Sequence, residues 1–76
     1  MYAKVREILI DKFYVDSMDI HPTSTIGNDL GLDSLEQVEL VMELEKEYGI
    51  SVPDEDLSYF STVQEIVDYI EKLKRK

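Results

Sequence analysis

The chain lacks the residues on which several kinds of catalytic site depend. It has no cysteine among its 76 residues, which excludes disulfides, thiolate zinc sites and cysteine nucleophiles. Its only histidine, His21, stands beside Pro22, and no Gly-x-Ser-x-Gly motif supplies an activated serine with an oxyanion hole. We therefore predict that the chain is not an enzyme.

Long hydrophobic runs are also missing. No apolar stretch is long enough to cross a bilayer, and no basic segment followed by an apolar one opens the chain. A chain of this length buries only a thin core and has little room for a substrate cavity. We expect a single small domain of residues 1–76 that is monomeric and cytoplasmic and does not insert into membranes.

Negative charge, by contrast, is abundant and localised. Residues 29–56 contain ten acidic residues and a single base, Lys46, so this segment accounts for the whole formal charge of −9. Such a field repels nucleic acid and favours basic protein surfaces. Residues 28–33 lack the ligand spacing of an EF-hand loop, and the acidic cluster at 54–56 is of a kind that is usually solvated. We predict protein partners with basic surfaces and no metal site, a loosely held divalent ion being the weaker alternative.

Helical spacing of apolar residues recurs along the chain, and no β pattern appears. Thr62 and Glu65 form a capping box before the last helix, which closes on Lys72, Lys74, Arg75 and Lys76. We predict an all-α fold, a small four-helix bundle of three main helices plus a short third helix that Asp54 caps. The helices are expected at 2–14, 34–48, 54–60 and from 63 onward.

A long loop is expected between the first two helices, at residues 15–33. It holds no periodic run, but apolar residues are scattered among turn-forming ones. We expect these apolar residues to pin the loop to the bundle: Met18, Ile20, Ile26, Leu30 and Leu32.

The second helix has two distinct surfaces when its residues are placed at 100° intervals. One is a narrow acidic stripe of Glu36, Glu39, Glu43 and Glu47. Its like charges repel by roughly 0.2–0.5 kcal/mol per pair. Lys46 is the only base expected to reduce this repulsion. An ordinary solvated face is one interpretation. Because local violations of design rules often mark function, we predict instead a docking surface for basic partners, with Leu35 and Met42 as apolar contacts at its edge.

The opposite surface of this helix is a broad apolar arc of Leu35, Val38, Leu40, Val41, Met42, Leu44 and Tyr48. Such an arc is more often plain core. Its breadth also fits a small expandable pocket between helices, since methionine adapts to irregular contents. The predicted lining consists of Val41, Met42, Leu57, Tyr59, Phe60 and Ile66.

Ser34 stands at the start of this helix, where two capping boxes are possible. Asp33 can pair with Glu36, or Ser34 with Gln37. If Asp33 caps the helix, the Ser34 hydroxyl is left free beside unpaired N–H groups that tolerate a phosphate. Gly31 lets the preceding loop turn. We interpret Ser34 as an attachment point for a phosphodiester.

The residues around Ser34 resemble a known family. The run Gly31-Leu32-Asp33-Ser34-Leu35 is similar to the Gly-x-Asp-Ser-Leu signature of acyl carrier proteins. The resemblance continues through residues 38–42, 50–55 and 62–64, and covers nearly all of the chain from residue 28 onward.

The resemblance implies that Ser34 carries a 4′-phosphopantetheine arm, transferred from coenzyme A by a separate magnesium-dependent transferase. The arm would supply the thiol that this chain lacks, and acyl groups would ride on it as thioesters to the acyl-transfer, condensing and reducing enzymes of fatty-acid synthesis. Asp33 matches the acid beside the modified serine and Leu35 the residue after it. By the same resemblance, Glu36, Glu39 and Glu43 match acids that contact arginines and lysines of partner enzymes.

The sequence departs from the family pattern at Leu32, Lys46, Ser58 and Tyr59. These departures leave open which pathway is served. A specialised carrier for polyketide, lipid A or aminoacyl chemistry is the first alternative, and an acidic helical module that is never modified is the second.

Overall fold

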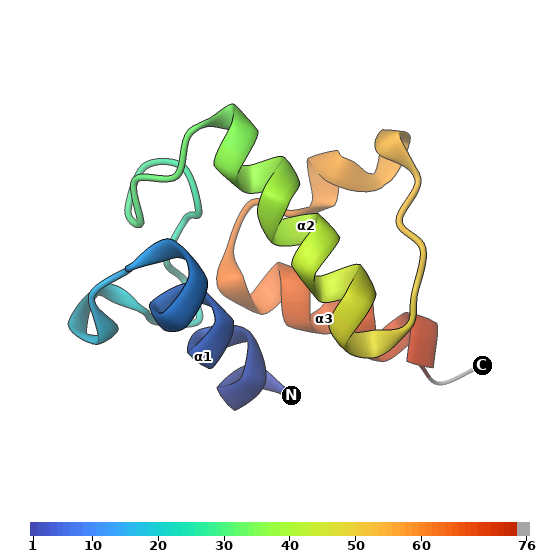
Figure 1. The fold of residues 1–76 in the computed structure, drawn as a ribbon, viewed down its shortest axis with the longest axis horizontal. Helices are drawn as coiled ribbons and strands as arrows, with labels where there is room; N and C mark the ends of the chain where they lie inside the picture. Colours follow the sequence, from blue (N-terminus) through green and yellow to red (C-terminus); the bar gives the residue numbers. More distant parts are fainter. Residues whose placement is uncertain (75–76) are drawn as a thin grey trace.

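The computed structural model describes residues 1–74, apart from the side chain of Tyr59. Within these residues every regular element is a helix and no strand forms, which confirms the predicted all-α bundle (Figure 1). Arg75 and Lys76, which we expected to close the last helix, lie outside the described residues. The elements in chain order are α1 (Tyr2–Phe13), η1 (Ser17–Asp19), α2 (Ser34–Tyr48), η2 (Asp54–Tyr59) and α3 (Val63–Lys74), where η denotes a 3₁₀ helix.

The helix ends follow local sequence signals in most places. The predicted capping box at the start of α3 is present: the Thr62 N–H donates to Glu65 Oε1 at 2.9 Å, and the Glu65 N–H to Thr62 Oγ1 at 3.2 Å. Helix α2 ends at Gly49, whose φ of 63° lies in the left-handed region that glycine adopts readily. Helix α1 ends in the same conformation at Tyr14, which is not a glycine.

The short third helix differs from its prediction. It is a 3₁₀ helix whose N-cap is Pro53, and no side chain caps it. Asp54, which we expected to be the cap, is the first helical residue. Pro53 itself takes the extended N-cap conformation, with φ at −63° and ψ at 147°, so that the helix begins at the next residue.

Three buried helix faces form the core. Helix α1 packs against both α2 and α3, and η2 packs against α3. In Figure 1, α2 runs from the loop at the top of the molecule toward the C-terminal end of the chain. The buried residues of the helices are Val5, Ile8 and Leu9 of α1, Leu40, Val41 and Leu44 of α2, and Val63, Ile66, Val67 and Ile70 of α3.

The long loop contributes to the same core. Ile20, Ile26 and Leu32 are buried as predicted, and Leu30 packs partly buried against them. The prediction for Met18 is wrong, since its side chain is 80% exposed. Met18 lies in η1, where Asp16 accepts its N–H, and this tight turn leaves the side chain at the surface. Apolar residues without a periodic pattern do not reveal which of them face inward.

Backbone hydrogen bonds tie this loop to the start of α3. The Ile26 N–H donates to the Ser61 carbonyl at 2.9 Å, and the Val63 N–H donates to the Ser24 carbonyl at 3.1 Å. Ser24 is itself buried, and its hydroxyl donates to the Asp19 carbonyl. The loop is therefore held at several points, and it delivers the chain to the beginning of α2 in a defined position.

Candidate functional site

The capping of α2 determines what the Ser34 hydroxyl is able to do. The Glu36 N–H donates to Asp33 Oδ1 at 2.8 Å, and the Asp33 N–H donates to Glu36 Oε1 at 3.1 Å. Of the two capping boxes that the sequence allows, the structure forms the one made by Asp33 and Glu36. In the other, the Ser34 hydroxyl would have been engaged by the helix.

Ser34 is the first residue of α2, and it is exposed. Its Oγ makes no hydrogen bond within residues 1–74, and neither the Ser34 N–H nor the Leu35 N–H has a partner there. These donors lie at the positive end of the helix dipole. A free hydroxyl with adjacent free N–H groups fits a covalently attached phosphate group.

Two residues of the loop before Ser34 position the start of α2: Gly31, which forms a turn, and Leu32, which is buried. Gly31 has a φ of 74°, a conformation that residues with a Cβ rarely adopt, whereas a Cβ placed there would meet nothing within 4 Å. The requirement for glycine is therefore conformational. Leu32 follows as the anchor: it is buried, and its carbonyl accepts from Gln37 Nε2 at 3.0 Å.

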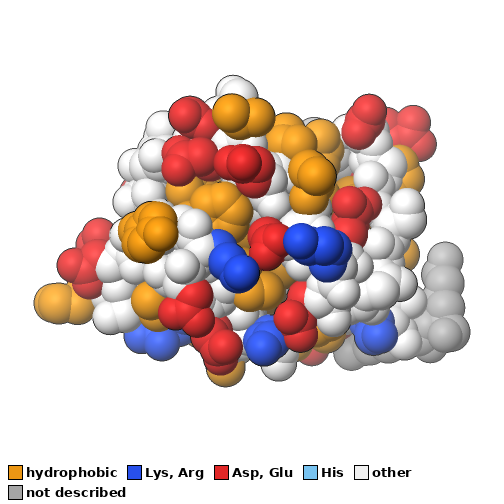
Figure 2. Space-filling view, in the orientation of Figure 1, with side chains coloured by type: hydrophobic (Ala, Val, Ile, Leu, Met, Phe, Trp, Pro, Cys, Tyr) orange, Lys and Arg blue, Asp and Glu red, His pale blue; other side chains and the backbone are white. Residues whose placement is uncertain are grey.

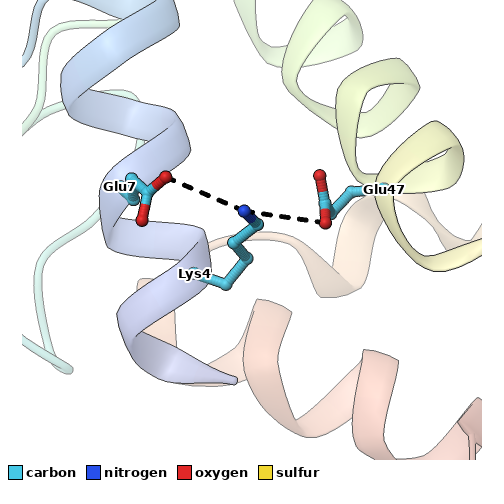
Figure 3. Close-up of polar contacts among 3 residues, drawn as sticks. All are labelled: Lys4, Glu7 and Glu47. Atoms are coloured by element: carbon cyan, nitrogen blue, oxygen red, sulfur yellow. Dashed lines mark ion pairs between the residues drawn. The ribbon is translucent and has the colours of Figure 1, made fainter.

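The acidic stripe of α2 is neutralised over half of its length. Glu43 lies 3.2 Å from Lys46 Nζ and 3.9 Å from Lys12 Nζ of α1. Figure 3 shows Lys4 of α1 reaching between Glu7 and Glu47, at 3.7 Å from each carboxylate. The expectation that only Lys46 relieves the stripe is wrong, because α1 packs beside α2 and brings two more lysines to it.

The other half of the stripe keeps its charge. Glu39 has no cationic partner among residues 1–74, and Glu36 accepts only the Asp33 N–H. In Figure 2, acidic side chains gather over the end of α2 where the helix begins, and basic ones lie over its middle. Within the acidic stripe, the glutamates that have no cationic partner among the described residues thus lie in the half of α2 that begins at Ser34.

Glu45 has a structural role that the sequence analysis missed. Its Oε2 accepts the Val52 N–H at 2.7 Å, which fastens the segment after α2 back onto the helix. Lys74 Nζ also donates to the Tyr48 carbonyl at 3.2 Å, which places a cation at the negative end of the α2 dipole. Neither contact leaves a local sequence signal, because each joins residues that the fold alone brings together.

The apolar arc of α2 divides into buried and exposed parts. Leu40, Val41 and Leu44 belong to the core. Leu35, Val38 and Met42 are 69%, 43% and 56% exposed, and they are spaced as neighbours on one side of the helix. Leu35 and Met42 thus lie at the surface beside the acidic stripe, and Val38, which we did not include in the docking surface, lies between them.

The residues predicted to line an acyl pocket come from α2, from η2 and the residue after it, and from α3. Val41, Phe60 and Ile66 are buried in one cluster, and Leu57 packs against it. The rings of Phe60 and Tyr69 form a T-shaped pair with centroids 5.1 Å apart. The side chain of Tyr59 lies outside the described part of the structure, and Met42 lies on the surface. The pocket itself stays a prediction.

The described structure also bears on two alternative roles, that of a membrane-spanning chain and that of a metal-binding module. Within residues 1–74, no helix combines the length and the apolar composition that crossing a bilayer requires. In the same part of the chain, no three histidine or acidic side chains are grouped closely enough to hold a metal ion.

Comparisons with known proteins identify the family. Residues 3–70 match the model of a family described as a phosphopantetheine attachment site. An acyl carrier protein of Chlorobium phaeobacteroides is 49% identical over 69 residues, which cover 91% of this chain and 88% of the relative. An acyl carrier protein of Chlorobium phaeovibrioides is 48% identical with the same coverage. Members carry covalent 4′-phosphopantetheine and are carriers, not enzymes. The chain belongs to the acyl carrier protein family.

Proposed function

We propose that Ser34 is the residue that carries the 4′-phosphopantetheine arm, and that the protein delivers acyl thioesters to the enzymes of fatty-acid synthesis in the cytoplasm. The observation that carries the proposal is the exposed Ser34 hydroxyl, which has no hydrogen-bond partner in the described part of the chain because Asp33 caps α2 in its place. When bound, the arm supplies the thiol that forms thioesters, a group that the cysteine-free chain lacks.

Attachment requires one displacement at phosphorus. Ser34 Oγ forms a new P–O bond to the phosphate that bears the pantetheine, and the pyrophosphate bond of coenzyme A breaks. The adenosine bisphosphate leaves, and the serine proton passes to a base of the transferase. The chain itself contributes the positioned hydroxyl and the positive end of α2, which stabilises the phosphodiester once it has formed.

The partner surface is the part of α2 next to Ser34. Glu36 and Glu39 carry charge without a cationic partner among the described residues, and Leu35 beside them exposes apolar area. A basic partner enzyme gains Coulombic attraction during its approach and apolar contact once it is docked. Met42 extends this surface, whereas Glu43 and Glu47 contribute less because lysines of the same chain already pair with them.

The attachment is tested by intact mass. Incubation with coenzyme A, Mg²⁺ and a phosphopantetheinyl transferase should raise the mass of the wild type by one arm. Ser34→Ala should show no increase, because it lacks the accepting oxygen. Ser58→Ala, which removes a different exposed serine, should be modified like the wild type.

An unmodified wild type would contradict the proposal and favour the alternative of an acidic helical module that only binds. A mass increase that persists in Ser34→Ala would show that the arm is attached elsewhere. The identity of the acyl groups that partner enzymes load onto the modified protein then separates a fatty-acid carrier from a specialised one.

The docking surface is tested by charge reversal. Glu39→Lys should lower kcat/KM for transfer to Ser34 by roughly tenfold at low salt, since electrostatic steering contributes at least this much to association with a charged partner. Added salt should slow the wild type more than the variant. Glu71→Lys makes the same charge change on an exposed position of α3 and serves as the matched control. Equal losses in the two variants would show that only net charge matters and would exclude a local docking surface.

The acyl cargo is proposed to shelter among Val41, Leu57, Phe60 and Ile66. Val41, Phe60 and Ile66 belong to the buried core, and Leu57 of η2 packs against that core. Hydrogen-bond geometry is poorer in a 3₁₀ helix than in an α-helix, which favours η2 as the element that yields to the cargo. Burying the chain there removes apolar area from water. The modified protein loaded with an octanoyl group should therefore melt at a higher temperature than the modified protein without cargo. Identical melting temperatures would mean that the cargo stays in solvent.

A further inference from the structure

A groove of about 640 Å³ runs between the end of α1 and the acidic face of α2. One wall is formed by Phe13 and Tyr14, and the other by Glu36, Glu39 and Met42. Among the described residues, the groove shares Met42 with the predicted lining of the acyl pocket, whereas Val41, Phe60 and Ile66 of that lining are buried in the core. It reaches the first turn of α2, because Glu36 lies in the same turn as Ser34.

Tyr14 is an unusual residue for its position. It ends α1 in the left-handed conformation, with φ at 58°, and it is the only residue other than glycine with a positive φ within residues 1–74. This conformation strains most residues with a Cβ, whereas glycine and asparagine adopt it at lower cost. The Tyr14 side chain is 89% exposed, so its ring recovers little of this cost by burial.

The backbone role of Tyr14 does not require a tyrosine. Its N–H donates to the Leu9 carbonyl and closes the end of α1, a bond that glycine or asparagine would also make. The fold alone therefore does not account for the aromatic ring. Strained and exposed residues of this kind are enriched at functional surfaces.

The electrostatics of the groove are uneven. Its lining contains Lys12 and Lys46, and both of them pair with Glu43. Glu36, Glu39 and Glu45 line the groove without a cationic partner among the described residues. Two of these three, Glu36 and Glu39, lie in the half of α2 that begins at Ser34. An enzyme that acts on the Ser34 hydroxyl must cover this same turn of α2.

We propose that the groove receives an arginine side chain of the phosphopantetheinyl transferase, held between the carboxylates of Glu36 and Glu39 and the ring of Tyr14. A guanidinium is the group that suits this lining, because it bonds carboxylates through several donors and also stacks on aromatic rings. The inference rests on the proposed function. It adds a residue of α1 to a recognition surface that otherwise belongs to α2.

Replacing Tyr14 separates recognition from folding. Tyr14→Asn should shift the urea midpoint of unfolding upward, because strain is relieved. It should also lower kcat/KM for arm transfer about three- to tenfold, the range expected for a lost cation–π contact. Tyr14→Phe keeps the ring and should transfer at nearly the wild-type rate. Met18→Gln changes an exposed residue that does not line the groove and should leave transfer unchanged.

A double-mutant cycle tests whether Tyr14 and Glu39 hold the same group. If they do, the loss in Tyr14→Asn combined with Glu39→Gln should be smaller than the product of the two single losses. Multiplicative losses, or wild-type transfer to Tyr14→Asn, would overturn the inference while leaving Ser34 as the attachment residue. A wild type that is never modified would instead overturn the proposed function.

Discussion

The hydrogen bond from the Glu36 N–H to the Asp33 carboxylate is the interaction on which the site depends. It gives a free N–H group in the first turn of α2 an acceptor from a side chain other than Ser34. The Asp33 N–H donates in turn to the Glu36 carboxylate and completes the capping box. The serine is then held on the first helical turn with its hydroxyl exposed. Asp33, the residue before Ser34, thus determines whether the Ser34 hydroxyl caps the helix or is available for modification.

The sequence was sufficient where structure is decided locally. The start of α2 near Ser34 and its end at Gly49 follow from local signals, as does the capping box of α3, although the sequence left open which of two capping boxes opens α2. The exposed state of Met18 was missed, because apolar residues in an irregular loop carry no period that assigns them to a face. The pairing of α1 lysines with α2 and the bond from Glu45 to Val52 were missed because only the packed fold creates them.

This long-range pairing changes how the acidic helix is understood. Taken alone, α2 presents a uniform stripe of glutamates that repel one another. In the folded chain, Lys4 and Lys12 offset the charge of Glu47 and Glu43, although such exposed pairs contribute little stability. Their larger effect is on the pattern of charge. The glutamates of the stripe without a cationic partner among the described residues, Glu36 and Glu39, are those nearest Ser34. Under the proposed function, they would draw a basic partner to the residue that carries the arm.

The most direct test of this account compares the rate of arm transfer in Asp33→Ala and Asp33→Asn. Loss of the cap in Asp33→Ala leaves Ser34 as the next side chain able to cap α2, and a cap contributes about 1 kcal/mol. Transfer should slow about fivefold as the Ser34 hydroxyl becomes engaged. Asparagine caps as well as aspartate and should keep most of the rate. Rapid transfer to Asp33→Ala, or equal slowing in both variants, would contradict the claim that Asp33 frees the serine by capping the helix.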